Sequence, residues 1–115
     1  MALQTNAIKN TLASAYATAC AYIGLATTAP GSSRGTEPTG GSPAYARKAS
    51  NWGSPTNGVI VATPAAHDVP AGTTVVGINM ESASTAGTYQ DGASVTSQTF
   101  ASQGQYAVTA TFTES

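Results

Sequence analysis

Small side chains dominate this chain of 115 residues. Alanine, glycine, serine and threonine account for 64 residues, whereas leucine, isoleucine, valine and phenylalanine account for only 16. Most buried positions therefore contribute less than the roughly 1.5–3 kcal/mol that a buried valine or leucine gives. A domain of about 100 residues also buries only some two-thirds of its unfolded surface. The sequence therefore predicts one small domain, residues 1–115, that gains part of its burial from neighbouring subunits.

Charge is nearly absent from the chain. Only 8% of the residues are charged, and the net charge is −1. Four cationic side chains cannot neutralise a run of phosphates, which excludes nucleic acid as a partner of a basic face. No stretch approaches the roughly 20 apolar residues that cross a membrane, so we expect no membrane partner. Low apolar content signals disorder only together with high net charge, so we expect a folded chain.

The single cysteine, Cys20, cannot form an intramolecular disulfide. It lies in an alanine-rich stretch, where a small buried side chain is favoured over a reactive thiol. The first residues lack the basic segment and the apolar core of a signal peptide. We therefore expect the protein to be made in the cytoplasm.

Residues 3–22 predict the one helix of the chain. Apolar residues recur there at steps of three and four and form one stripe. The stripe consists of Ile8, Leu12, Ala15, Tyr16, Ala19 and Ile23. Thr5 or Asn6 can cap the start of the helix, and Gly24 can mark its exit. Because the stripe is thin and rich in alanine, we expect it to pack closely against a sheet or a neighbouring subunit.

Strand signals fill most of the remaining chain, interrupted by a long loop at residues 29–43 that is rich in proline and glycine. The tight-turn dipeptides Asn57-Gly58 and Asp91-Gly92 punctuate the β region, residues 44–113. The expected strands span residues 21–28, 44–49, 59–63, 73–80, 87–90, 94–100 and 105–113. This spacing predicts a mainly β fold, a small antiparallel β-sandwich or a jelly-roll-like barrel, with one N-terminal α-helix.

The residue pattern predicts no catalytic, metal or cofactor site. Gly31–Gly35 matches G-x-S-x-G around Ser33, but a nucleophile elbow needs a strand before it and a helix after it, and a proline- and glycine-rich loop surrounds this one. His67 lies beside Asp68, and one histidine without thiolates makes no recognisable metal site. We interpret the His67-Asp68 pair as the entry to a turn.

Glu37 within the long loop and Arg47 just after it are conspicuous in a chain with so few charges. They could form a buried or interfacial ion pair, or they could be ordinary surface charges. The planar guanidinium also suits loop carbonyls. We expect an ordered loop that contacts a neighbouring subunit, with Arg47 fixing its base.

Tyr45 and Trp52 could stack on sugars, although strand aromatics of a small domain more often belong to the core.

Several segments together resemble a known protein family. The most specific of them is Gly-Gly-Ser-Pro-Ala-Tyr-Ala-Arg at residues 40–47, and residues 23–31 and 69–75 add to it. The similarity spans roughly residues 8–113. It is to small virion proteins of tailed bacteriophages and prophages of actinobacteria, described as tail-fibre-like or minor structural proteins. Ala26 and Ala29 stand where that family pattern has a histidine and an aspartate, so no catalytic or metal role is carried over.

This resemblance implies a non-enzymatic structural protein on the outer surface of a virion, made in the host cytoplasm. It would act as a capsid decoration or tail-fibre-like minor protein that stabilises the assembled particle. Its partners would be copies of itself in a homotrimer and the major capsid or tail protein. The interface or structural candidates are Glu37, Tyr45, Arg47 and Trp52. The alternative is an adhesion module of the tail that binds a host cell-surface glycan, and a small hydrolase is the least favoured reading.

Overall fold

The computed structural model describes residues 3–114, so both ends of the predicted 1–115 domain lie outside the described residues. The first element is a helix, α1 (Asn6–Ala19), and strands make up the rest of the regular structure. The strands are β1 (Tyr22–Ala26), β2 (Lys48–Ala49), β3 (Val59–Ala62), β4 (His67–Val69), β5 (Thr73–Glu81), β6 (Tyr89–Phe100), β7 (Gly104–Tyr106) and β8 (Ala110–Thr113). The predicted mainly β fold with antiparallel strands and one N-terminal helix is confirmed.

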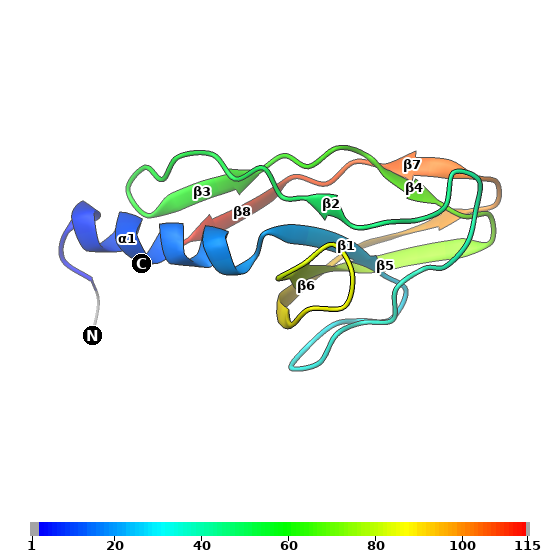
Figure 1. Cartoon of the computed structure of the whole chain (residues 1–115), viewed down its shortest axis with the longest axis horizontal. Helices are drawn as coiled ribbons and strands as arrows, with labels where there is room; N and C mark the ends of the chain where they lie inside the picture. Colours follow the sequence, from blue (N-terminus) through cyan, green and yellow to red (C-terminus); the bar gives the residue numbers. More distant parts are fainter. Residues whose placement is uncertain (1–2, 115) are drawn as a thin grey trace.

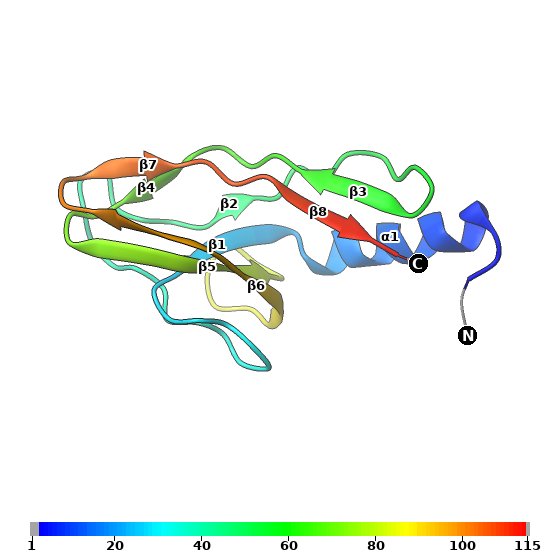
Figure 2. The same cartoon turned by 180° about the vertical axis from the view of Figure 1, so that it is seen from behind.

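The strands form two layers, as Figures 1 and 2 show from opposite sides. One layer is an antiparallel sheet in the order β2-β1-β5-β6, and the other consists of two separate ladders, β3-β8 and β4-β7. The helix α1 leads into β1 along the long axis and lies beside the β3-β8 ladder (Figure 1). The molecule is elongated, with extents of 48 × 24 × 23 Å. This arrangement is the sandwich form of the predicted fold.

The core lies between the two layers and consists mostly of medium-sized side chains. Its members are Cys20, Ile23, Leu25, Ala62, Val69, Val75, Ile78, Met80, Phe100 and Val108. Aromatic contacts extend it toward α1, where the ring of Tyr16 stacks on Phe112 at 3.8 Å and meets Trp52 edge-on at 5.8 Å. Such pairs add to the stability that area burial alone provides. The expectation that Cys20 is a small buried side chain is confirmed.

Several boundaries differ from the predicted ones. The predicted helix 3–22 spans only Asn6–Ala19, because Cys20 caps it and β1 begins at Tyr22. The predicted strand 44–49 is reduced to the two residues of β2. The predicted strand 105–113 is two strands, β7 and β8, because its halves pair with different partners, β4 and β3.

The predicted hairpin at Asp91-Gly92 is wrong. Both residues lie inside β6, paired with Met80 and Asn79 of β5. The chain turns instead in the loop at residues 82–88, just before β6. Gly92 instead allows Pro30 to lie close to the sheet, because a Cβ at position 92 would stand 2.7 Å from the Cβ of Pro30.

Only part of the predicted apolar stripe packs against the β region, where Tyr16 stacks on Phe112 and Ile23 is buried in the core. Ile8 and Leu12 are 43% and 39% exposed, whereas Ala13 on another face is fully buried. Near the start of β3 the chain comes close to α1, since the Asn10 Oδ1 accepts a 2.8 Å hydrogen bond from the N–H of Gly58. Ala13 fits this close contact, whereas Ile8 and Leu12 face outward.

Candidate functional site

The segment between β1 and β2, residues 27–47, covers the face of the sheet that points away from the core. We call it the covering loop. Pro30 lies over Gly77, where an added Cβ would stand 2.5 Å from the Pro30 Cδ. Gly35 exchanges two hydrogen bonds with the buried side chain of Asn79, at 3.1 and 3.0 Å. The irregular segment is thus fixed on the sheet and is longer than the predicted loop 29–43.

Missing Cβ atoms allow this close approach. Gly24 of β1, Asn79 of β5 and Gly92 of β6 are cross-strand neighbours, so they form a row across the sheet. A Cβ at Gly24 would stand 2.7 Å from the Tyr45 Oη and 2.8 Å from a carboxylate oxygen of Glu37. The two glycines, with Asn79 between them, therefore form the floor on which the functional side chains lie.

Four of the nine charged residues meet on this floor, and we call Arg34, Glu37, Arg47 and Glu81 the charge cluster. Arg34 binds the fully buried carboxylate of Glu81 with both ends of its guanidinium, at 2.8 and 2.6 Å. Arg47 binds Glu37 at 2.7 Å, and its Nη2 lies 3.7 Å from Glu81. Paired two-point contacts of this kind are the stronger class of charged hydrogen bonds.

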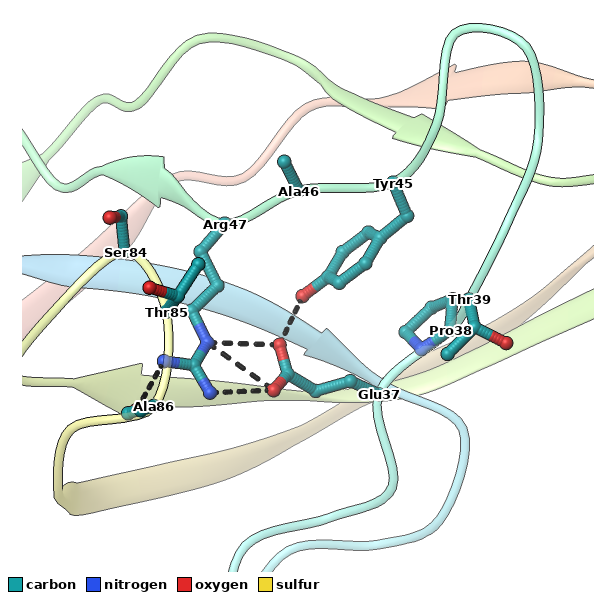
Figure 3. Close-up of a pocket in the computed structure, with 9 residues that line it drawn as sticks. All are labelled: Glu37, Pro38, Thr39, Tyr45, Ala46, Arg47, Ser84, Thr85 and Ala86. Carbon is teal, nitrogen blue, oxygen red and sulfur yellow. Dashed lines mark hydrogen bonds and ion pairs between the residues drawn. The ribbon is translucent and has the colours of Figure 1, made fainter.

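Arg47 joins two loops through its remaining donors. Its Nε donates to Glu37, and its Nη1 donates to the carbonyls of Ala83 and Ala86, at 3.0 and 2.8 Å. Those carbonyls belong to the loop between β5 and β6, which we call the β5-β6 loop. Figure 3 shows the contacts with Glu37 and Ala86. Four of the five N–H groups of the guanidinium thus donate to carboxylate and carbonyl oxygens. Only 7% of the Arg47 side chain is exposed.

Tyr45 completes the contacts of the Glu37 carboxylate. Its hydroxyl donates to Glu37 at 2.7 Å and accepts from the N–H of Leu25 at 2.9 Å. Burial alone raises the pKa of Glu37, but the hydrogen bonds from Arg47 and Tyr45 outweigh it and hold the pKa below its usual range. Burial and the bond to Glu37 raise the pKa of Tyr45. At neutral pH the site therefore holds an ionised carboxylate and a neutral phenol.

The structure brings together three of the four candidate residues, Glu37, Tyr45 and Arg47. The fourth, Trp52, lies elsewhere and donates from Nε1 to the carbonyl of Cys20 at 2.8 Å. The ion pair between Glu37 and Arg47, one of two possibilities left open, is present. The carbonyls that Arg47 binds belong to the β5-β6 loop rather than to the covering loop.

Sequence reasoning missed Arg34, Glu81 and Asn79. One signal was available, because Asn79 and Glu81 alternate with the apolar residues Ile78 and Met80 within one strand. Polar side chains at alternate positions of a strand share a face. Polar residues on the second face of a core strand indicate that another segment covers that face. The covering loop was long enough to be that segment.

An open pocket of about 320 Å³ lies beside the cluster. Figure 3 shows its lining, in which the Arg47 and Tyr45 side chains converge on the Glu37 carboxylate. Ser84 and Thr85 of the β5-β6 loop line it, and so does Thr39 of the covering loop. The pocket offers hydroxyl groups and the 20%-exposed side chain of Glu37 to a polar ligand.

Comparisons of the chain with models of protein families, with curated proteins and with solved structures find no match. Within residues 3–114, no three or more histidine, cysteine or acidic side chains lie together as metal ligands would. No helix in the same part of the chain is long and apolar enough to cross a membrane. The role of the charge cluster is therefore inferred from its geometry.

His67 is a second buried polar group, and its interpretation as a turn entry is wrong. It begins β4 and is fully buried. Its Nε2 lies 2.8 Å from the carbonyl of Ile23, so Nε2 carries the proton, and Nδ1 has no hydrogen-bond partner among the described residues. Burial lowers the pKa of His67 below its usual value, and the carbonyl of Ile23 offsets only part of this effect.

We predict that stability falls in mild acid because of His67. The folded state keeps the imidazole neutral, whereas the unfolded chain takes up a proton as the pH drops below about 6.5. The free energy of unfolding should be level above that pH and fall below it, with a slope approaching about 1.4 kcal/mol per pH unit. Urea titrations between pH 7.5 and 5 measure this slope.

The variant His67→Gln provides the control, because its amide can still donate to the carbonyl of Ile23 but does not titrate. Its free energy of unfolding should be nearly constant over the same range, whatever its absolute value. Equal slopes in the two proteins would show that another group is responsible.

Proposed function

We propose that the protein is a non-enzymatic structural subunit on the outer surface of a tailed bacteriophage particle. There it decorates the capsid or forms a tail-fibre-like minor protein, and it stabilises the virion by binding the major capsid or tail protein as a homotrimer. The resemblance carried by residues 40–47 supports this proposal, together with two features of the structure.

The position of the exposed apolar residues carries the proposal. The three large hydrophobic residues that are exposed in the described chain are Ile8, Leu12 and Val61, and they belong to α1 and β3. These two elements pack against each other at one end of the molecule (Figure 1). That end consists of a helix and a two-stranded ladder, which are too thin to cover their outer faces. Val61 points away from α1, because its neighbour Ile60 pairs with Phe112, which stacks on Tyr16 of the helix. Both outer faces of this end therefore carry exposed apolar groups that an assembly can cover.

The charge cluster supports a structural role for the polar residues. A general acid or base needs a free position from which to exchange a proton with a substrate. Both carboxylate oxygens of Glu37 accept from Arg47, and one also accepts from Tyr45. The carboxylate of Glu81 is fully buried under Arg34. These contacts hold loops in place on the sheet. A rigid subunit that binds only the assembled lattice adds its binding free energy to the assembled state.

Gold-conjugated antibodies on intact particles test this proposal. We expect label on the head surface or along the tail. We also expect particles without the protein to release their DNA at a lower temperature than particles to which the purified chain has been added back. Add-back of heat-unfolded chain serves as the control. Purified particles that lack the protein altogether would contradict the proposal.

The open pocket favours a second candidate, a glycan-binding adhesion module of the tail. Hydroxyl side chains, a partly exposed carboxylate and a tyrosine ring are groups that bind sugars. A glycan array with the wild-type chain tests this alternative, with Thr85→Ala in the pocket wall as the matched variant. Binding that Thr85→Ala weakens would favour the adhesion module, whereas an array without hits would count against it.

A further inference from the structure

The helix α1 leaves part of its apolar stripe exposed. Toward the β3-β8 ladder it presents Tyr16, which stacks on Phe112, the fully buried Ala13, and Asn10, whose side chain binds the backbone of Gly58. On the outer face, Ile8 and Leu12 remain 43% and 39% exposed. A surface helix normally places its larger apolar residues against its own core. The exposed face of α1 therefore has a use that the fold of one chain does not explain.

The spacing on this outer face is that of a coiled coil. Ile8, Leu12, Ala15 and Ala19 follow one another at steps of four, three and four. Alternating steps of three and four define the a and d positions of a heptad, with Leu12 at a and Ile8 at d. We call these four residues the α1 seam. The side of α1 away from the ladder is open in both views of the molecule (Figures 1 and 2).

We propose that the α1 seams of three copies of this chain pack in parallel and form the contact that makes the protein a trimer. This inference rests on the proposed function, because it names the surface through which the proposed homotrimer forms. Leucine at a with isoleucine at d favours parallel bundles of three or four helices over pairs. A 14-residue helix is marginal alone in water, but α1 is already held by its own β region, so no helix has to form on association.

The charges of the helix favour a second copy of the chain as the occupant. The seam carries no charged residue, and the one charged residue of α1 is Lys9. Its Cβ lies close to Gly58, on the side of the ladder. Identical seams can therefore meet without the repulsion that like charges would cause. A partner of opposite charge would find nothing on this face to pair with.

Light scattering and sedimentation of the full chain test the contact. We expect the wild-type mass at micromolar concentration to be three times 11.4 kDa. Leu12→Glu places a charge on the seam and should weaken association at least 100-fold, which leaves a folded monomer. Ser14→Glu adds the same charge at an exposed position of α1 outside the seam, and it should associate like the wild type. Circular dichroism checks that both variants keep the β fold.

Disulfide trapping tests the parallel orientation. In a Cys20→Ala background, Ile8→Cys brings identical thiols together at the axis of a parallel bundle, so oxidation should give covalent dimers in high yield. An antiparallel arrangement would place that position opposite the other end of the helix and give none. Ser14→Cys in the same background is the control for random collision.

Each outcome bears on the seam separately from the proposed function. A trimer that persists in Leu12→Glu, or an oligomer without the Ile8→Cys cross-link, would overturn the parallel seam, while gold labelling of particles would still stand. A monomeric wild type whose Leu12→Glu variant fails to join particles would mean that the seam binds a different virion protein, which overturns self-association. Absence from particles, with the trimer and the cross-link present, would contradict the proposed function alone.

Discussion

The buried carboxylate of Glu81 is the constraint on which the covering loop depends. A fully buried charge is costly unless it is paired and hydrogen-bonded. Arg34 supplies two hydrogen bonds to it from the covering loop, and Arg47 lies close enough to add a second positive charge. Arg47 then reaches from Glu37 to the carbonyls of the β5-β6 loop. Two loops without regular structure are thus tied to one strand end by charges that pair with one another.

The scarcity of large side chains has a specific consequence in the sheet. The covering loop leaves no room for a Cβ at Gly24, Gly77 and Gly92. The loop therefore acts as a third layer that lies directly on the backbone. A small residue also determines a contact of α1. Ala13 fits the close contact with the ladder, and Ile8 and Leu12 remain exposed. Small residues permit close contacts within the chain and also leave apolar surface for contacts between chains.

Local signals were predictable from the sequence, whereas signals that depend on a distant segment were not. The dipeptide Asn57-Gly58 forms the expected turn, and both residues have positive φ angles, 51° and 79°. Asp91-Gly92 has the same local pattern but stays extended, because both residues pair with β5, and Pro30, some sixty positions earlier, lies above Gly92. The Glu37–Arg47 pair was within reach because these charges are isolated in the sequence. The role of Glu81 was not, since only the folded loop brings Arg34 to it.

Amide hydrogen exchange in Arg47→Ala tests most directly whether the charge cluster holds both loops on the sheet. We expect loss of protection at the N–H of Gly35 in the covering loop and of Thr88 at the β5-β6 loop, with the β3-β8 ladder still protected. The free energy of unfolding should fall by about 3 kcal/mol, because Glu37 loses its partner in a largely buried pair. Lys48→Ala, which removes the neighbouring cation, should leave both loops protected. Unchanged exchange at Gly35 and Thr88 in Arg47→Ala would show that the charge cluster does not hold these loops on the sheet.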